Sequence, residues 1–120
     1  MGYAFSSVDE LGDGVFRKIR PGLGITAFGA NAVVLAPGGA SRPHFHEQQD
    51  ELYFIHSGRA RFDLPGESRE LRSGGLCHVE STTPRQVTNI GDEDLVMLVV
   101  GGNDGYVERD GGPADPAELG

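Results

Sequence analysis

Three side chains near the middle of the sequence have the types and the spacing of a metal site. His44 and His46 are two residues apart, and Glu51 follows them after the polar segment 47–50. Side chains two apart on an extended strand point to the same face, so the two imidazoles project together. If 44–46 and 51–55 are adjacent antiparallel strands, Glu51 returns to the level of both histidines. Two nitrogens and one carboxylate oxygen then converge on one point.

This set of donors has a recognised coordination chemistry. Two histidines and one carboxylate suit non-haem Fe(II) and leave positions open for substrate and oxygen. The same set fits catalytic zinc, which uses three protein ligands and one open position. A His-x-His pair also occurs in ordinary surface strands, and the neighbouring acids Glu47 and Asp50 show how easily a carboxylate falls within reach by chance. On spacing alone, a metal site and a plain surface strand both stay open.

The elements that must position these side chains are short strands. The chain has 120 residues, enough for one domain, and its 19 glycines and 7 prolines are spread along it. Frequent turns between short apolar runs predict an all-β fold, a sandwich or a barrel closed from two sheets, and no helix is expected. Strands are predicted around 14–20, within 24–36 (two strands), and at 51–55, 59–64, 70–72, 76–80, 85–90 and 95–100.

The two ends of the chain differ in pattern. Residues 1–108 are predicted to form one β-barrel domain, with Tyr106 and Val107 packed against it. Apolar periodicity is lost after this point, so we expect 109–120 to be a flexible C-terminal tail.

Charge and cysteine content limit the partners and the compartment. The chain has 10 basic and 18 acidic residues, a net charge of −8, which repels nucleic-acid phosphates and anionic lipids. Neither a nucleic acid nor a membrane is therefore expected as a partner. Cys77 is the only cysteine, which fits a reducing compartment, and no signal-peptide or membrane-length apolar run is seen. We expect a cytoplasmic protein.

The spacing around the histidines resembles a known motif. The segment from Gly38 to Gly58 reads G-x5-H-x-H-x4-E-x6-G, which is similar at every position to the first motif of the cupin superfamily. The second motif of that family, G-x5-P-x-G-x2-H-x3-N, is matched only at its ends, by Gly74 and Asn89. The resemblance implies a single-domain jelly-roll β-barrel, often a homodimer. It also implies that His44, His46 and Glu51 are the first three ligands of a divalent ion, with Fe, Zn, Mn and Ni all open.

Arg85 stands where the second motif of the family has its histidine ligand. A guanidinium stays protonated and has no lone pair to give, so Arg85 is not a ligand. It can point away and leave a three-ligand site, or hold an anionic substrate beside the metal. It can also pair with Glu51 and replace the metal, and the plainest alternative is an ordinary structural ion pair, for example with Glu80.

Other side chains are assigned by their place on the strands. Tyr53 and Ile55 are two and four residues from Glu51, so on a strand they face the same side, and they should line the interior together with Phe62. These three residues join Arg85 as candidate substrate-binding residues. His56 should face the opposite way. Cys77 is expected to be a small buried residue, a ligand only if it faces inward, and the direction of His78 is open.

Three functions compete. The first is a metal-dependent oxygenase or isomerase acting on a small organic molecule. The second is a metal-free pocket for an anionic or sugar-like ligand, or an epimerase-like enzyme that uses Arg85 with His44, His46 and a tyrosine as proton-transfer groups. The third is a barrel with no catalytic role.

Overall fold

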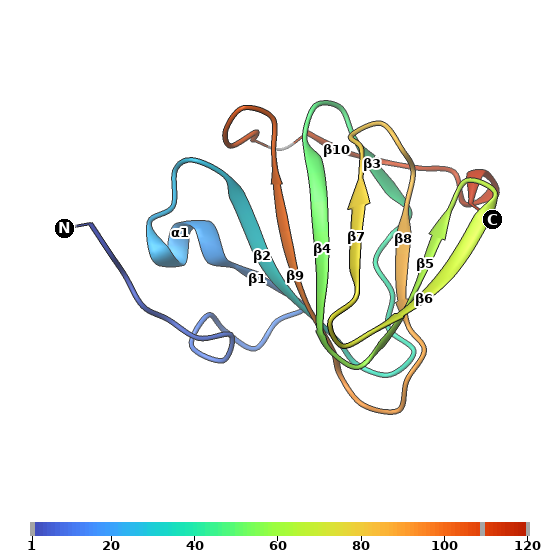
Figure 1. Cartoon of the computed structure of the whole chain (residues 1–120), viewed down its shortest axis with the longest axis horizontal. Helices are drawn as coiled ribbons and strands as arrows, with labels where there is room; N and C mark the ends of the chain where they lie inside the picture. Colours follow the sequence, from blue (N-terminus) through green and yellow to red (C-terminus); the bar gives the residue numbers. More distant parts are fainter. Residues whose placement is uncertain (1, 109, 120) are drawn as a thin grey trace.

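The computed structural model describes residues 2–108 and 110–119, which form ten short strands, one short α-helix and one 3-10 turn. Figure 1 shows the strands arranged in two layers, with the N-terminal segment trailing away from them. Every paired strand runs antiparallel to its neighbour. The all-β prediction is therefore confirmed.

The larger layer is a five-stranded sheet with the order β1-β2-β9-β4-β7. Its strands are β1 (Phe16–Lys18), β2 (Gly29–Leu35), β9 (Leu95–Gly102), β4 (Asp50–Ser57) and β7 (Leu76–Val79). β9 pairs with β2 on one side and with β4 on the other, and so lies at the centre of the sheet.

The second layer combines a three-stranded sheet, β6-β5-β8, with a two-stranded sheet, β10-β3. A single bridge between His44 and Arg85 joins the two parts, and a second bridge pairs Ala40, in the segment before β3, with Thr88 of β8. The His44 strand and the Arg85 segment are therefore neighbours in this layer. The strands are β3 (His44–His46), β5 (Arg59–Leu64), β6 (Glu67–Arg72), β8 (Gln86–Asn89) and β10 (Gly111–Pro113).

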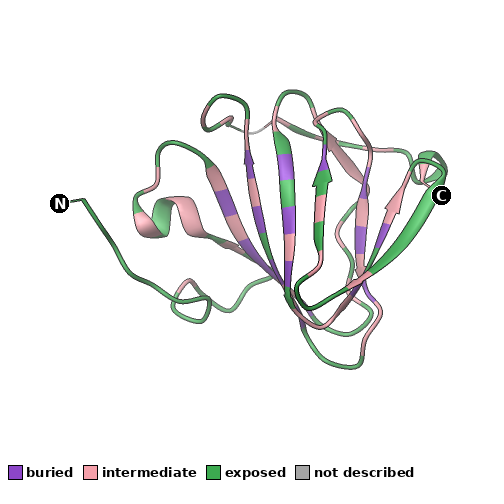
Figure 2. Ribbon diagram, in the orientation of Figure 1, coloured by how far each residue is buried: buried purple, intermediate pink, exposed green. Residues whose placement is uncertain are grey.

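The core lies between the layers. Along β4 the side chains alternate, with Glu51, Tyr53 and Ile55 buried and Leu52 and His56 exposed, as the bands in Figure 2 show. The predicted parity of Glu51, Tyr53 and Ile55, opposite to that of His56, is confirmed. The buried side chains of both layers form one hydrophobic cluster: Val33, Leu35, Tyr53, Ile55, Ala60, Phe62, Val79, Val87, Leu95, Met97 and Val99.

Gly58 makes the turn that leads from β4 into β5. Its φ is +96°, a left-handed conformation that costs other residues about 1–2 kcal/mol. A Cβ atom at this position would lie 2.8 Å from the backbone oxygen of Asp94. Only glycine therefore lets the end of β4 approach the start of β9 this closely.

Two predictions near the N-terminus are wrong in detail. The strand expected at 14–20 is only the three residues of β1, and it continues into the helix α1 (Ile19–Leu23). Pro21 lies in the first turn of α1, where its fixed φ is compatible with a helix, and Gly24 ends the helix at φ +72°. Over 24–36 one strand, β2, replaces the two expected, because its apolar run begins only at Gly29.

The C-terminal residues contain more regular structure than their composition suggests. Within the range predicted to be a tail, β10 pairs with β3, and a 3-10 turn η1 (Pro116–Glu118) follows. Asp115 caps η1 by accepting a hydrogen bond from the backbone N–H of Ala117 at 2.9 Å. The flexibility of this segment stays a prediction. Neither helical segment among the described residues has the length and apolar character needed to cross a membrane.

Candidate metal centre

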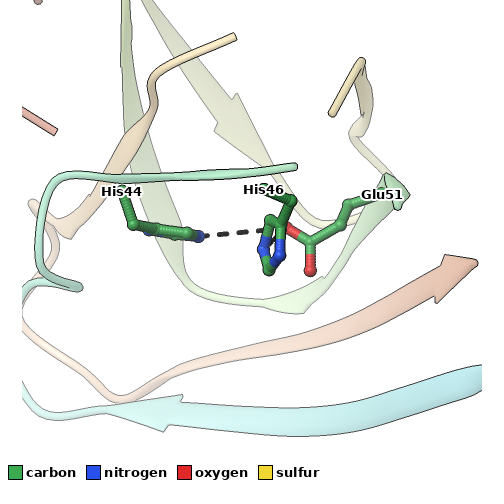
Figure 3. A group of neighbouring side chains, drawn as sticks. All are labelled: His44, His46 and Glu51. Carbon is green, nitrogen blue, oxygen red and sulfur yellow. Dashed lines mark ion pairs between the residues drawn. The ribbon is translucent and has the colours of Figure 1, made fainter. Parts of the chain in front are cut away.

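The two candidate histidines and Glu51 come from opposite layers of the barrel. His44 and His46 lie on β3, whereas Glu51 lies at the start of β4 in the five-stranded sheet. The antiparallel pairing of 44–46 with 51–55 is therefore not formed, because β3 pairs with β10 instead. The three side chains nevertheless converge across the interior, and one donor atom from each lies within 4.8 Å of the others (Figure 3).

The two imidazoles present the same ring nitrogen to the carboxylate. The Nε2 atom of His46 lies 3.2 Å from Oε1 of Glu51, and the Nε2 atom of His44 lies 3.9 Å from the same oxygen. The rings are 5.3 Å apart and nearly perpendicular, at 87°. Figure 3 shows both rings directed toward the Glu51 carboxylate. The donor atoms of the three side chains therefore face a common point.

The opposite ring nitrogens are held by acceptors. Nδ1 of His44 lies 2.9 Å from the backbone oxygen of Arg42, and Nδ1 of His46 lies 2.8 Å from Oδ1 of Asp110. A carbonyl and a carboxylate only accept, so each Nδ1 carries the hydrogen and donates it. The Nε2 lone pair of each neutral ring is then free to bind a metal. This donor set fits a divalent ion with three protein ligands.

Glu51 is buried and held in its ionised form. Burial by itself raises the pKa of its carboxyl, but the close approach of the His44 and His46 rings and the hydrogen bond from Tyr53 outweigh burial and bring that pKa well below its usual range. The Tyr53 hydroxyl donates to Oε1 at 2.7 Å, and the Gln49 amide donates to Oε2 at 3.2 Å. Burial raises the pKa of Tyr53 well above its usual value, so this hydroxyl keeps its proton and remains a donor.

A proton and a metal ion compete for the Nε2 atom of His46. Burial lowers its pKa, but the contacts with Glu51 and Asp110 outweigh burial, so the pKa of His46 is raised. Without a metal the ring therefore holds its second proton to higher pH than a free histidine does. A bound metal has to displace that proton, which makes metal affinity increase with pH.

Arg85 is fully buried and lies beside this group. Its Nη1 atom is 3.9 Å from Oε1 of Glu51, too far for a hydrogen bond. Its Nη2 atom donates to the backbone oxygens of Glu80 at 3.0 Å and Val79 at 3.4 Å, so Glu80 contributes its carbonyl and not its carboxylate. Its Nε and Nη1 atoms have no hydrogen-bond partner among the described residues. Arg85 thus does not point away from the site.

The charges of the site nearly cancel. Glu51 and Asp110 contribute two negative charges and Arg85 one positive charge, a net charge of −1 with both histidines neutral. A divalent ion would change this sum to +1. In a buried site of low effective dielectric constant, the remaining positive charge favours an anion at the open positions.

The other candidate residues lie deeper in the barrel or on its outside. Tyr53 and Phe62 contact edge to face, with ring centroids 5.2 Å apart, and Ile55 is completely buried in the same cluster. Their contact with a substrate stays a prediction. Cys77 lies opposite Tyr53 and packs partly buried against the core, but it is not among the clustered donors. His78 is exposed on the outer face.

Asp110 was missed by sequence reasoning. It lies 64 residues from His46, in a segment with no apolar period, and no local spacing indicates the contact. A cavity of about 210 Å³ also adjoins this part of the site. Lys18 and Arg20 line it together with His46 and Asp110, and the Arg20 guanidinium stacks 3.9 Å from the centre of the Tyr106 ring.

The chain is similar to several characterised or solved proteins. It is 32% identical over 66 residues to an oxalate-binding protein of Thermotoga maritima, and this match covers 55% of this chain and 54% of that protein. The chain thus spans about half the length of the curated relatives it matches. A structure described as a predicted oxalate decarboxylase from the same organism superimposes with a TM-score of 0.58 and 29% identity, over 61% of this chain and 64% of that one.

The fold is matched more completely by another structure. A cupin protein from Bacteroides fragilis superimposes with a TM-score of 0.75 over 91% of both chains, at 23% identity. The model of the cupin domain family matches residues 31–101, a range that includes both candidate histidines, Glu51 and Arg85. With its two-layered barrel and its His-x-His…Glu cluster, this chain belongs to the cupin family.

Proposed function

We propose that this protein is a metal-dependent cupin enzyme, an oxygenase or an isomerase, whose substrate is a small organic carboxylate. The observation that carries the proposal is the orientation of the two imidazoles. Each Nδ1 is held by an acceptor, and each Nε2 is directed at the ionised Glu51 carboxylate. When bound there, a divalent ion supplies a Lewis acid with open positions for substrate.

The residues around the donors support an anionic substrate. Arg85 has two buried N–H-bearing nitrogens without an acceptor among the described residues, Nε and Nη1, and Nη1 lies 3.9 Å from the carboxylate of Glu51. A guanidinium binds carboxylates through paired hydrogen bonds, so Arg85 would hold and orient one end of the substrate. Two relatives whose descriptions refer to oxalate are consistent with this class of substrate. Tyr53 would keep its proton and hold Glu51 in place.

The experiment starts from metal-free protein. We expect Co²⁺ or Mn²⁺ to bind with one ion per chain in calorimetric titration and to raise the melting temperature. Oxalate is then expected to bind the metal-loaded protein at least tenfold more tightly than the metal-free protein, because the ion adds two positive charges to the site. The absence of any stoichiometric divalent-ion binding would remove the proposal.

A metal-free pocket is the second candidate. The observation in its favour is the fixed cation at the place of the fourth ligand, since Arg85 already neutralises Glu51 in part. In that case Arg85 alone would bind an anionic or sugar-like ligand, and the two histidines would transfer protons. Oxalate binding that is equally tight with and without a chelator would support this candidate against the first.

We also propose that the chain forms a homodimer through the outer face of the five-stranded sheet. Leu52, Leu76 and Leu98 are 43%, 62% and 37% exposed on this face. β9 has only apolar side chains directed outward, at positions 96, 98 and 100. Two copies that each carry a charge of −8 repel one another, and an uncharged central strand avoids placing like charges in contact. A second copy of the chain therefore fits this face.

The dimer predicts a clear result for one substitution. Leu98→Glu places a charge at the middle of the outer face, so it should convert the protein to a monomer while the fold is kept. The measurement is the molar mass in solution by light scattering. Val15→Glu is the control, because Val15 is similarly exposed, at 44%, and precedes the sheet. A monomeric wild type, or an unchanged mass for Leu98→Glu, would contradict the proposal.

A further inference from the structure

We propose that Asp110 is a positioning residue for the metal centre, and that the C-terminal strand β10 is required to complete the site. The inference rests on the proposed metal binding, but it concerns a different part of the chain. The family match ends at residue 101, so neither Asp110 nor β10 belongs to the matched region. The ligand His46 is thus oriented by a segment that the family motif does not contain.

The Asp110 carboxylate is fixed by three donors. Oδ1 accepts from Nδ1 of His46 at 2.8 Å, and Oδ2 accepts from the backbone N–H groups of Gln48 and Gln49, both at 2.8 Å. Its side chain is only 7% exposed. Because both oxygens are bound and two of the donors are backbone groups, the carboxylate cannot rotate away from His46. The position of the imidazole is therefore determined by the loop that joins β3 to β4.

This contact selects the form of His46 that binds a metal. With Nδ1–H donated to a carboxylate, the lone pair is on Nε2 and faces Glu51. The negative charge also makes Nε2 a better electron donor. His44 has a neutral backbone carbonyl at the corresponding place, so the two ligands are held differently. The side-chain amide nitrogen of Gln49 also lies 3.2 Å from Nδ1 of His46, but Asp110 is closer, at 2.8 Å, and is the partner that can accept the Nδ1 hydrogen.

The pairing of β10 with β3 determines where Asp110 lies. Gly111 is opposite His46 and Pro113 is opposite His44, and the backbone oxygen of Asp110 accepts from the N–H of Glu47 at 3.1 Å. A Cβ atom at Gly112 would lie 2.9 Å from Cζ of Phe45, so a larger residue here would require the Phe45 ring to move. The register formed by β10 and β3 thus places the Asp110 carboxylate at Nδ1 of His46.

The test compares Asp110→Ala and Asp110→Asn with Asp115→Ala. Asp115 belongs to the same C-terminal segment, but it only caps η1. We expect Asp110→Ala to weaken Co²⁺ binding by about 10–100-fold. Asp110→Asn should lose less Co²⁺ affinity, because its amide oxygen still accepts from Nδ1–H of His46. The Co²⁺ affinity of Asp115→Ala should stay within twofold of that of the wild type. All titrations are made well below the melting temperatures of the metal-free proteins, so that each variant is folded.

A spectroscopic readout separates positioning from stability. In the zinc-loaded wild type, ¹⁵N–¹H spectra of the imidazoles should show His46 with its hydrogen on Nδ1, and the absorption bands of the Co²⁺ form should shift in Asp110→Ala but not in Asp115→Ala. An Asp110→Ala affinity within twofold of the wild type, or an equal loss in Asp115→Ala, would overturn this inference alone. Failure of the wild type to bind any divalent ion would overturn the proposed function and this inference together.

Discussion

Replacing His46 by alanine is expected to weaken Co²⁺ binding by about a thousandfold. The free energies of protein metal sites correspond to about 3–4 kcal/mol for each ligand, and a site with three protein ligands has no replacement for the one removed. His46 is also the ligand with the closer approach to Glu51, at 3.2 Å. The binding constant is measured by calorimetry on protein stripped of metal.

Thermal unfolding gives the same result independently. At a Co²⁺ concentration a thousand times the dissociation constant, the wild type gains about 4 kcal/mol, which corresponds to a rise in melting temperature of about 10 °C or more. His46→Ala should show almost none of this rise. His56→Ala is the matched control, because His56 lies on the exposed face of β4. A metal-dependent rise that survives in His46→Ala would place the ion elsewhere.

Replacing Arg85 by methionine is expected to change metal and anion binding in opposite directions. The fixed cation beside Glu51 opposes a divalent ion, so its removal should tighten Co²⁺ binding by about tenfold or more. The same substitution removes the donors proposed to hold the substrate carboxylate, so oxalate should bind the Co²⁺-loaded variant about 10–100-fold less tightly. A residue with a purely structural role would not produce opposite shifts.

Arg85→Met also has a cost in stability, which the measurement has to allow for. Breaking a buried ion pair leaves Glu51 without its cation and destabilises the metal-free protein by about 3 kcal/mol. Arg85→Lys retains the charge and should keep the wild-type metal affinity, whereas Arg61→Met removes an arginine that pairs with Asp63 on the surface. Equal losses of metal and oxalate affinity in Arg85→Met would contradict the assigned role.

The parts of the site that sequence could predict are those encoded locally. His44 and His46 share a face because they are two apart on a strand, and Glu51 has the parity of the core residues Tyr53 and Ile55. The positive φ of Gly58 and its contact with the start of β9 give a physical reason for glycine at that position of the motif. The shared face of the two histidines and the parity of Glu51 depend on a few consecutive residues, so spacing alone is sufficient to predict them.

The parts that sequence could not predict depend on contacts between distant segments. β3 was expected beside the Glu51 strand, but it pairs with β10 some 65 residues further along the chain. Asp110 precedes a Gly-Gly-Pro run that contains no apolar pattern, so neither its strand nor its contact with His46 is visible in the sequence. The buried position of Arg85 likewise depends on two backbone carbonyls that no motif records.

The short pairing of β3 with β10 has a consequence for the lifetime of a bound ion. β10 has three residues, and its two ends, Gly111 and Pro113, are exposed, whereas β9 is paired on both sides along its length. Segments with few buried contacts open locally at a much lower free energy than the core. We expect the C-terminal strand to detach from β3 far more often than the barrel unfolds. Metal release would then follow the rate of this opening, and the protein could exchange its ion while its hydrophobic core stays closed.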